Sequence, residues 1–448
     1  MINIEAVAGA LTEQGFTLSD ARSRAALLRQ AAEGLRRLTG AEPQWSWLVP
    51  GRLEVFGKHT DYGGGRTLVA AVPRGFAVAA IARPDRLVRA YDARNDELCE
   101  IHLDGTDTPR GWRSYVAVTA RRLAANFPGA DLGADVAFTS DLPRAAGMSS
   151  SSALIIALAN VLIRRGRLEE RDEWTTTIGS IEQRVEYFGC VENGDSFRAL
   201  AGTRGVGTEG GSEDHAAILM SRAGHLSQFG FMPLHRVSDV VLPASWSFVI
   251  ASSGVHADKA GTVRNQYNRA ARAARAIVSV WNGSVETPAR SLAVALSSSA
   301  DAEGHLREVL QRASGGDFTS ADLLRRLDHF IREDGRVPEA AAAFATGQAE
   351  RLGDLSAGSQ ADADALLGNQ VVETNDLVEA ARGLGAMAAS SFGAGFGGSA
   401  WALVPADAAA QFGPAWRDAY AARHPQRSDG RWFAARPGPG ILEVPTGA

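Results

Sequence analysis

Hydrophobic positions between residues 4 and 38 recur at spacings of three and four, as in Leu27, Leu28, Ala31, Leu35 and Leu38. This period is typical of amphipathic helices, so the segment predicts a pair of scaffold helices. The pattern changes around residues 53 to 56, where apolar and polar side chains alternate. The alternation predicts a strand that ends in a polar cluster just before three consecutive glycines.

Further along, residues 76 to 105 also alternate, with turn-forming residues at 83 to 85 and at 94 to 96. This arrangement predicts a hairpin. Residues 111 to 127 have the pattern of an amphipathic helix, and residues 174 to 192 form another helical stretch.

The second half begins with a change of composition near Val241, which predicts two domains, residues 1–240 and 241–448. A buried strand is expected at 246 to 252, followed by a long helix. Residues 285 to 384 are mainly helical, with breaks predicted at Gly315–Asp317 and Gly335–Pro338.

Composition and charge exclude some classes of partner. The chain has 448 residues, of which 45% are hydrophobic and 22% charged, as in an ordinary globular protein. A formal net charge of -5 provides no basic field for nucleic acid. No apolar run approaches the roughly 20 residues that span a bilayer, so we expect no membrane partner.

Two cysteines, Cys99 and Cys190, are too few for a disulfide framework or a cysteine zinc site. The N-terminus lacks the basic and apolar regions of a signal peptide. Both observations favour a reducing, cytoplasmic location.

The most informative stretch is Asp141 to Ile163, where Pro143 leads through small residues into four consecutive serines and an apolar run of helical length. This pattern predicts a loop that enters a helix N-terminus. Such a terminus has unpaired N–H groups and attracts anions. The serines either cap the helix or direct a hydroxyl toward a metal ion that accompanies phosphate.

A second cluster places hydrogen-bonding side chains within eleven residues: Arg52, Lys58, His59, Asp61 and Tyr62. A Walker phosphate loop does not fit here, because the glycine spacing is five instead of four and His59 stands where Ser or Thr belongs. The cluster beside glycines suits recognition of a polyhydroxylated ligand, because each buried polar group needs a partner.

Asp214 lies in a glycine-rich polar segment, residues 193 to 215, at the point where this loop enters a buried stretch. An acid in that setting either orients or deprotonates a hydroxyl, or caps a helix. A third glycine-rich segment, SSFGAGFGGSAWALV at residues 390 to 404, lies directly before a predicted strand. Its glycines allow close backbone approach to another chain segment or to a ligand.

Taken in order, these segments resemble the motifs of the GHMP kinases, and within them the galactokinase branch. GRLEVFGKHTDYGGG is similar to the signature GRxNxIGEHxDYxxG, PRAAGMSSSSA to the phosphate loop PxGxGLSSSA, and GAGFGG to the C-terminal motif. Between them, WRSYV resembles WxNYV, and GGSEDH resembles the GIMDQ segment that contains the catalytic acid. Two later segments, VIASSGVHADKAGTVRNQYNR and LSAGSQADADALL, also look like galactokinase segments.

The resemblance implies a role for each matching residue. Asp214 is expected to accept or orient the sugar hydroxyl proton, and Arg52 to neutralise the transferred phosphoryl group. The expected sugar contacts are Lys58, His59, Asp61 and Tyr267. The expected nucleotide contacts are Trp112 and Tyr115 at the adenine and, around the phosphates, Ala145, Ala146, Gly147, Met148, Ser149, Ser150 and Ser151.

The resemblance also implies the fold and the ligands. The fold is α+β, with an N-terminal domain like ribosomal protein S5 domain 2, a ferredoxin-like C-terminal domain, and the site between them. ATP and Mg²⁺ are the implied cofactors, with Ser150 and Glu186 on the metal and Glu182 and Glu192 as competing carboxylates. The expected partners are ATP and a sugar, with the chain a monomer or a small homo-oligomer.

Departures from the motif concern the substrate. Galactokinases have Glu where this chain has Lys58, and Asn where it has Glu54. Because Lys has donors and no acceptor, Lys58 either pairs with Glu54 or meets an anionic sugar such as a uronic acid. The acid after GRL also resembles plant arabinokinases, which adds a pentose as a third option. Further departures are Ala145 for Gly, His215 for Gln, and an insertion before Asp214.

The predicted activity is an ATP-dependent sugar kinase acting on an anomeric hydroxyl, with galactose as the leading neutral substrate. The alternative is a catalytically silent relative that senses sugar and ATP. Arg52, Ser150 and Asp214 are all present, and a sensor needs none of them for chemistry. A kinase for a mevalonate-like or amino-acid alcohol is disfavoured by the HTDY sequence.

Overall fold

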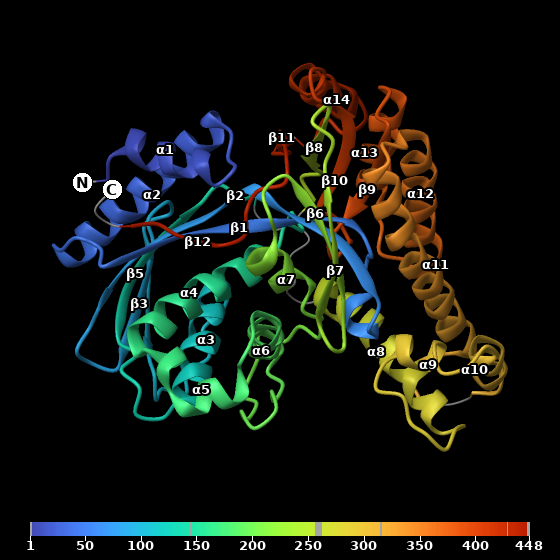
Figure 1. The fold of residues 1–448 in the computed structure, drawn as a ribbon, viewed down its shortest axis with the longest axis horizontal. Coiled ribbons are helices and arrows are strands. Elements are labelled where there is room, and N and C mark those ends of the chain that lie inside the picture. Colours follow the sequence, from blue (N-terminus) through green and yellow to red (C-terminus); the bar gives the residue numbers. More distant parts are fainter. Residues whose placement is uncertain (1, 144–145, 256–261, 314–315, 428, 446–448) are drawn as a thin grey trace.

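The fold combines two β-sheets with helices that cover them, as seen in a computed structural model that describes residues 2–143, 146–255, 262–313, 316–427 and 429–445 (Figure 1). The first sheet contains β1 (Trp45–Phe56), β2 (Arg66–Ala82), β3 (Leu87–Asp92), β4 (Glu97–His102), β5 (Ala134–Ser140), β6 (His225–Gly230), β7 (His235–Val241) and β12 (Leu442–Glu443). Its main order is β12-β1-β2-β5-β3-β4, and β6 joins it by pairing with β2 and β7. Within the described ranges, β3 and β5 are the one parallel pair of this sheet.

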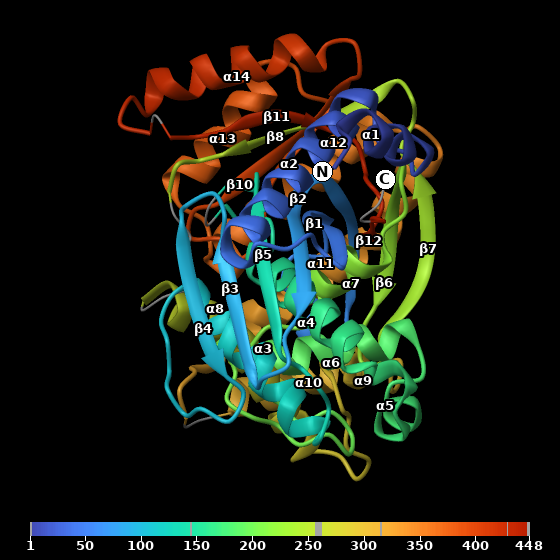
Figure 2. The ribbon, with the colours of Figure 1, turned by 90° about the vertical axis from the view of Figure 1, so that its left-hand side faces the viewer.

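Helices cover both faces of the first sheet (Figures 1 and 2). On one face lie α1 (Ile4–Glu13) and α2 (Leu18–Thr39), the predicted scaffold pair, whose alanines and leucines pack against Leu48, Ala77, Ala79 and Ala137. The other face is covered by α3 (Trp112–Asn126), α4 (Ser150–Gly166), α5 (Asp172–Thr177), α6 (Ile181–Asn193) and α7 (Glu213–Met220). Small residues on the strands allow these helices to approach the sheet closely.

The second sheet is antiparallel, with β8 (Trp246–Ser252), β9 (Ala388–Phe392), β10 (Ser399–Pro405) and β11 (Trp432–Ala435) in the order β11-β8-β10-β9. Alternate residues of β8 and β10 face opposite sides, as expected for a pleated strand. Val249, Ala251, Ala400 and Ala402 pack with α13 (Val372–Gly383) and α14 (Ala409–Arg423). The opposite side faces α11 (Ser320–Ala345) and α12 (Ala349–Asp362).

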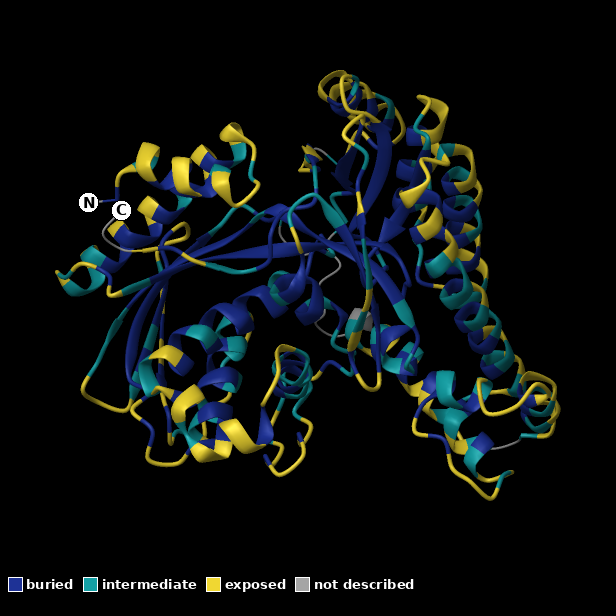
Figure 3. Cartoon of the chain, viewed as in Figure 1, coloured by how far each residue is buried: buried dark blue, intermediate teal, exposed yellow. Residues whose placement is uncertain are grey.

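One hydrophobic core continues from the first sheet into the second (Figure 3). The rings of Phe56 at the end of β1 and Trp401 on β10 are 6.1 Å apart, and Phe248 on β8 lies 5.7 Å from Trp401. Burial of such large aromatic rings resists separation of the sheets. The space between the two domains therefore has a defined geometry.

A helical projection extends beyond the two sheets and has a core of its own. It consists of α8 (Thr262–Asn282), α9 (Leu292–Leu296), α10 (Ala302–Arg312) and the first half of α11 (Figure 1). Short helical turns complete the fold at Asp61–Gly63, Leu168–Glu170 and Ala363–Leu367. None of the helices in the described residues is long and apolar enough to cross a membrane.

Three predictions about the fold need correction. The predicted hairpin at 76 to 105 exists only as β3–β4, because β5 inserts between β2 and β3. The C-terminal strand of the predicted second domain, 241–448, belongs to the first sheet, because β12 pairs with β1 through Trp47↔Glu443. The change of sheet itself falls between β7 and β8.

The third correction concerns Gly335–Pro338, which interrupts no helix: α11 runs unbroken through both residues. The preceding acids fix this part of α11 to the first domain. Asp334 accepts hydrogen bonds from the backbone N and the guanidinium of Arg66, and Glu333 accepts from the backbone N of Gly57. These tertiary contacts outweigh the cost of a proline in the helix. The other predicted break, at 315–317, begins outside the described residues and lies between α10 and α11.

We predict that Asp334→Ala lowers the free energy of unfolding by about 2 kcal/mol, because it leaves the partly buried Arg66 without its charged partner. Denaturant unfolding measures the change. Glu339→Ala is the matched control on the same helix, since its pairing with Arg351 is exposed on both sides and is expected to contribute less than about 0.5 kcal/mol. Equal effects of the two variants contradict the anchoring role of Asp334.

Candidate active site

The loop before α4 presents a helix N-terminus that no side chain caps. Ser149 occupies the cap position with a left-handed φ of 60°, and its hydroxyl makes no capping hydrogen bond. The Ser149 hydroxyl is buried without a hydrogen-bond partner. Ser149 therefore does not cap the helix, which was one of the two sequence interpretations. The N–H groups of the first turn are left for another acceptor, as the phosphate interpretation requires. Ala145, one of the predicted loop residues, lies outside the described residues.

The third glycine-rich segment packs directly onto this loop. A Cβ on Gly393 would lie 2.7 Å from the carbonyl oxygen of Gly147, and Gly393 has a φ of +84° that disfavours other residues. The Ser399 hydroxyl donates to the carbonyl oxygen of Ala146 at 2.7 Å. The glycines of the second domain thus allow backbone-to-backbone contact that fixes the loop from the far side of the cleft.

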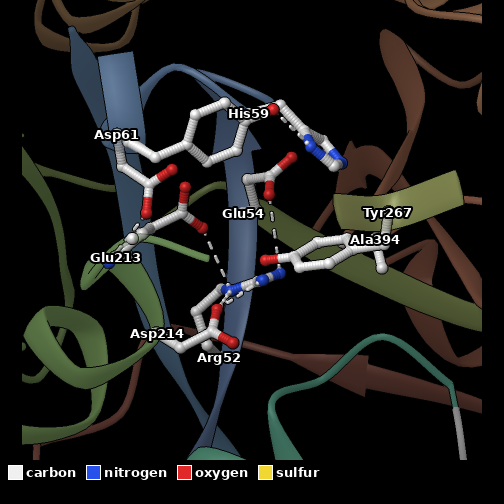
Figure 4. A pocket seen from close by; sticks show the side chains of 11 residues that line it. Arg52, Glu54, His59, Asp61, Glu213, Asp214, Tyr267 and Ala394 are labelled. Atoms are coloured by element: carbon white, nitrogen blue, oxygen red, sulfur yellow. Dashed lines mark hydrogen bonds and ion pairs between the residues drawn. The ribbon is translucent and has the colours of Figure 1, made fainter. Parts of the chain in front are cut away.

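Beside the loop lies a small pocket whose lining is mainly polar and charged side chains (Figure 4). It is lined by Arg52, Glu54, His59, Asp61, Tyr62, Gly211, Glu213, Asp214, Tyr267, Gly393 and Ala394. The lining comes from β1, the turn after it, α7, α8 and the loop after β9. Segments from both domains therefore build the pocket.

Arg52 joins this pocket to the loop before α4. Its guanidinium donates to Asp214 Oδ1 from Nε at 2.8 Å and from Nη2 at 2.5 Å. Its Nη1 donates to the carbonyl oxygen of Gly147 at 3.2 Å, and its backbone N to that of Met148 at 3.2 Å. Register shifts in the β1–β2 ladder on either side of Arg52 and Glu54 direct both side chains into the pocket.

Burial and charge act together on Arg52. Burial alone lowers the pKa of its guanidinium, but the carboxylates of Asp214, Glu213 and Glu54 more than offset that effect and leave the pKa raised. Arg52 is therefore a permanent cation. It holds Asp214 in place at the N-terminus of α7, where acidic side chains are favoured by the helix dipole.

Two further carboxyls face the pocket. Glu54 Oε2 lies 3.7 Å from Arg52 Nη1, and Glu213 Oε1 lies 3.1 Å from Arg52 Nε. Burial raises the pKa of Glu54 to about 7, although the nearby charges of Arg52 and Lys58 act in the opposite direction. Burial also raises the pKa of Glu213 well above its usual value, with the neighbouring Glu54 charge adding to the shift. The pocket therefore gathers several carboxyl groups, two of them with raised pKa values, around one cation.

The predicted sugar-binding residues His59, Asp61 and Tyr267 all line the pocket. Asp61 accepts a hydrogen bond from the backbone N of Glu213 at 3.2 Å, and its buried carboxyl has a raised pKa because of that burial. The ring of His59 lies 5.4 Å from that of Tyr267, and its Nδ1 is 2.9 Å from the Tyr62 hydroxyl. The turn after β1 therefore offers carboxylate, imidazole and phenol groups to one ligand.

Lys58, also predicted to bind substrate, does not line the pocket. Its Nζ is buried and donates to the hydroxyls of Ser359 at 2.6 Å and Ser390 at 2.8 Å, in the second domain. Gly57, with a φ of +99°, turns the chain so that Lys58 departs from the direction of Arg52 and Glu54. No hydrogen bond joins Lys58 to Glu54 among the described residues, although the charge of Glu54 raises the pKa of Lys58 against the larger lowering by burial. The contact of Lys58 with a sugar stays a prediction.

The carboxylate beside the helix N-terminus is Glu192 and not the predicted Glu186. Glu186 accepts a hydrogen bond from the backbone N of Leu234, on the far side of α6. Glu192, nearly two turns later, accepts from the Ser152 hydroxyl at 2.7 Å, and that hydroxyl lies 3.4 Å from Asp214 Oδ2. A helix turns about 100° per residue, so the two glutamates face different neighbours.

A second cavity lies on the other side of the loop. Trp112 and Tyr115, at the start of α3, line it together with Ser150 and Ser151. The Trp112 indole N–H donates to Glu97, and its ring packs edge-on against Phe138. The flat group predicted for this place, an adenine, would therefore lie close to the loop that faces its phosphates.

The oxygen ligands beside the loop suit a metal ion that is shared with phosphate and water. Within the described residues, no group of three or more His, Cys, Asp or Glu side chains is arranged to hold a metal ion. Mg²⁺ is commonly held by one or two carboxylates together with phosphate oxygens and water. The Ser152–Glu192 pair beside the loop offers oxygen ligands of that kind.

Sequence reasoning assigned no contact to three pocket residues and to one residue in the first turn of α4. Tyr62 was named in the cluster without a contact, and Glu54 was weighed as a partner of Lys58 and as the acid after GRL. Glu213 and Ser152 lie in the quoted motifs but were given no role of their own. The alternation of β1 places residues 52 and 54 on one side of the strand, which was a usable signal for Glu54. Glu213 had no such signal, because the start of α7 is set by packing.

Three family models match the chain. The galactokinase galactose-binding signature matches residues 35–82, which contain the turn after β1. The GHMP kinases N-terminal domain matches residues 114–186, which contain the loop before α4. The GHMP kinases C-terminal domain matches residues 340–422, which contain the glycine-rich loop after β9.

Individual proteins give the same picture. The chain is 29% identical over 383 residues to a galactokinase of Chloroflexus aurantiacus, covering 84% of this chain and 87% of that one. It is 26% identical over 383 residues to a galactokinase of Actinobacillus succinogenes, covering 84% and 90%. The fold matches the Lactococcus lactis galactokinase solved with galactose, with a TM-score of 0.74 at 22% identity over 93% of this chain and 100% of that one. The mevalonate kinase of Methanococcus jannaschii matches less closely, with a TM-score of 0.53 at 12% identity over 88% and 98%.

The buried position of Lys58 predicts an unusual pH dependence of stability. Burial lowers the pKa of Lys58 from its ordinary value of 10.5, so between the two values the unfolded chain binds more protons than the folded one. The free energy of unfolding of the wild type, relative to Lys58→Met, must therefore rise with pH from the lowered pKa up to about 10.5. Urea unfolding of both chains at several pH values measures the difference, in which other titrating groups cancel. A difference that falls with pH, or stays flat, contradicts the burial of this charge.

Proposed function

Because this chain is a GHMP kinase of the galactokinase-like branch, we propose that it transfers the γ-phosphoryl group of ATP to the anomeric hydroxyl of a monosaccharide. The products are a sugar 1-phosphate and ADP. The observation that carries the proposal is the double contact of Arg52, which donates hydrogen bonds to Asp214 in the polar pocket and to Gly147 in the loop at the helix N-terminus. Acceptor and donor sites thus share one cation.

On the acceptor side, Asp214 is the group that takes the hydroxyl proton. Its Oδ1 accepts two hydrogen bonds from Arg52, which orient the carboxylate. Its Oδ2 is directed toward Ser152 and the loop. As the hydroxyl oxygen forms its bond to phosphorus, the bond from phosphorus to the ADP oxygen breaks and the proton passes to the Asp214 carboxylate.

On the donor side, the backbone of Ala146 to Ser151 surrounds the phosphates, and Trp112 and Tyr115 enclose the adenine. Arg52 lies between the pocket and this loop, where negative charge accumulates during transfer. Phosphoryl transfer requires chiefly alignment and charge neutralisation, both of which a rigid loop and a fixed guanidinium supply. The contact of Gly393 with Gly147 supplies that rigidity.

Mg²⁺ fits the oxygen ligands beside the loop, and when bound it neutralises phosphate charge. Ser150, at the first position of α4, and Glu192 are the residues that would hold it. Ser152 keeps Glu192 in position through its hydrogen bond. Glu192 takes this role in place of Glu186, because Glu192 contacts the first turn of α4 whereas Glu186 is bonded to Leu234.

Galactose is the leading neutral acceptor. The relatives that match over most of their length are named galactokinases, and the Lactococcus lactis neighbour was solved with galactose. His59 and Asp61 stand at the matching positions of the signature and face the pocket. A uronic acid loses its rationale, because Lys58 does not face the pocket. The sensor alternative gives the Arg52–Asp214 contact no chemical role.

We predict that Asp214→Asn lowers kcat by about a hundredfold to ten thousandfold, the usual contribution of a positioned acid or base. ADP release with galactose and a panel of hexoses, pentoses and uronic acids measures turnover. Because the adenine cavity is untouched, ATP affinity should remain within about threefold of the wild type, as checked with a fluorescent nucleotide. Turnover that survives in this variant removes Asp214 from the base role, and wild-type binding of ATP without turnover of any sugar favours the sensor.

The two glutamates of α6 provide a matched pair of variants. Glu192→Gln should raise the Mg²⁺ concentration for half-maximal turnover by about tenfold, because it removes the charge that faces the metal site. Glu186→Gln should leave that concentration unchanged, since an amide oxygen still accepts the Leu234 hydrogen bond. The opposite pattern would restore Glu186 as the metal residue.

A further inference from the structure

The sugar pocket has more carboxyl groups than its one guanidinium can pair with. Four carboxyl groups face it: Glu54, Asp61, Glu213 and Asp214 (Figure 4). Arg52 is the one Lys or Arg side chain in its lining among the described residues. Its hydrogen bonds are already assigned to Asp214 and to the carbonyl oxygen of Gly147.

Two of the carboxyls retain oxygen atoms without a donor. Glu54 Oε1 is buried with no hydrogen-bond partner, and the Glu54 residue is only 3% exposed. Glu213 Oε1 lies near Arg52 Nε, yet that N–H is directed to Asp214 and the oxygen makes no hydrogen bond. The Glu213 residue is 4% exposed. Buried acceptors of this kind are costly unless a ligand supplies the missing donors.

The resemblance to galactokinases makes this pair specific to the chain. In the motifs GRxNxIG and GIMDQ, the positions of Glu54 and Glu213 are Asn and Met. The exchange of both residues adds two carboxyls to the pocket while Arg52, Asp61 and Asp214 are kept. Lys58, the cation that also departs from the motif, donates its Nζ hydrogen bonds to Ser359 and Ser390. Its charge lowers the pKa of Glu54, but it gives no hydrogen bond to either carboxyl.

We propose that the acceptor is an amino sugar whose ammonium group is bound by Glu54 and Glu213. An ammonium has three donors and no acceptor, which matches two buried acceptor oxygens, and its charge offsets that of the added carboxyls. A neutral hydroxyl supplies one donor and no charge. The inference rests on the proposed kinase function and assigns the substrate class at the same site.

The test is ADP release with three matched sugars: galactose, 2-amino-2-deoxygalactose and its N-acetyl derivative, extended to the 3-, 4- and 6-amino positions and to the gluco series. We expect kcat/KM for one free amino sugar to exceed that of its hydroxyl parent and of its N-acetyl form by at least about tenfold. In Glu54→Gln and Glu213→Gln, the ratio of amino to parent sugar should fall by about tenfold or more. Glu13→Gln, an exposed carboxyl at the end of α1, should leave the ratio unchanged.

The outcomes separate the two proposals. Equal or better turnover of neutral sugars overturns the amino-sugar inference and leaves the kinase function standing. No turnover of any sugar overturns the kinase function as well. If a Gln variant fails to fold, the comparison of amino, hydroxyl and N-acetyl sugars with the wild-type chain still decides the inference.

Discussion

The site depends on a single buried guanidinium held between two elements that would otherwise be independent. Arg52 projects from β1 toward Asp214 at the start of α7 and toward the carbonyl of Gly147 in the loop before α4. A cation in the interior is tolerated because three carboxyls surround it. The same arrangement orients the proposed base and places positive charge where phosphate charge would develop. Fold stability and chemistry therefore share one set of contacts.

The second domain completes the site by backbone contact. Gly393 and Gly147 meet so closely that a single added carbon would collide with the opposite chain. The continuous core beneath them, with Trp401 between Phe56 and Phe248, fixes the distance at which the two sheets lie. Asp334 and Glu333 on α11 add anchors to the turn after β1. Such contacts suit phosphoryl transfer, in which a small misplacement of the reacting groups lowers the rate strongly.

On the acceptor side, the direction of Lys58 determines how the two added carboxyls, Glu54 and Glu213, are interpreted. A lysine in the signature suggested an anionic sugar, yet Gly57 turns Lys58 toward the serines of α12 and β9. Lys58 thus does not line the pocket, whereas Glu54 and Glu213 add two carboxyls to it. The expected charge of the sugar substituent therefore changes from negative to positive. The direction of the Lys58 side chain decided which substrate charge is expected, since a buried charge acts most strongly on the groups nearest to it.

The sequence by itself determined the periodicity of the helices and strands, the three glycine-rich segments and, through motif spacing, the family and the pocket residues Arg52, His59, Asp61, Asp214 and Tyr267. These are local properties, because glycine, alternation and motif order are expressed along the chain. Only the tertiary structure decided that α11 passes through Pro338, that β12 returns to the first sheet, that Glu192 and not Glu186 reaches the loop, and that Lys58 is directed away while Glu213 faces the pocket. Each of these outcomes follows from contacts between residues far apart in the chain, whose free energies outweigh local propensity and are not visible in any short segment.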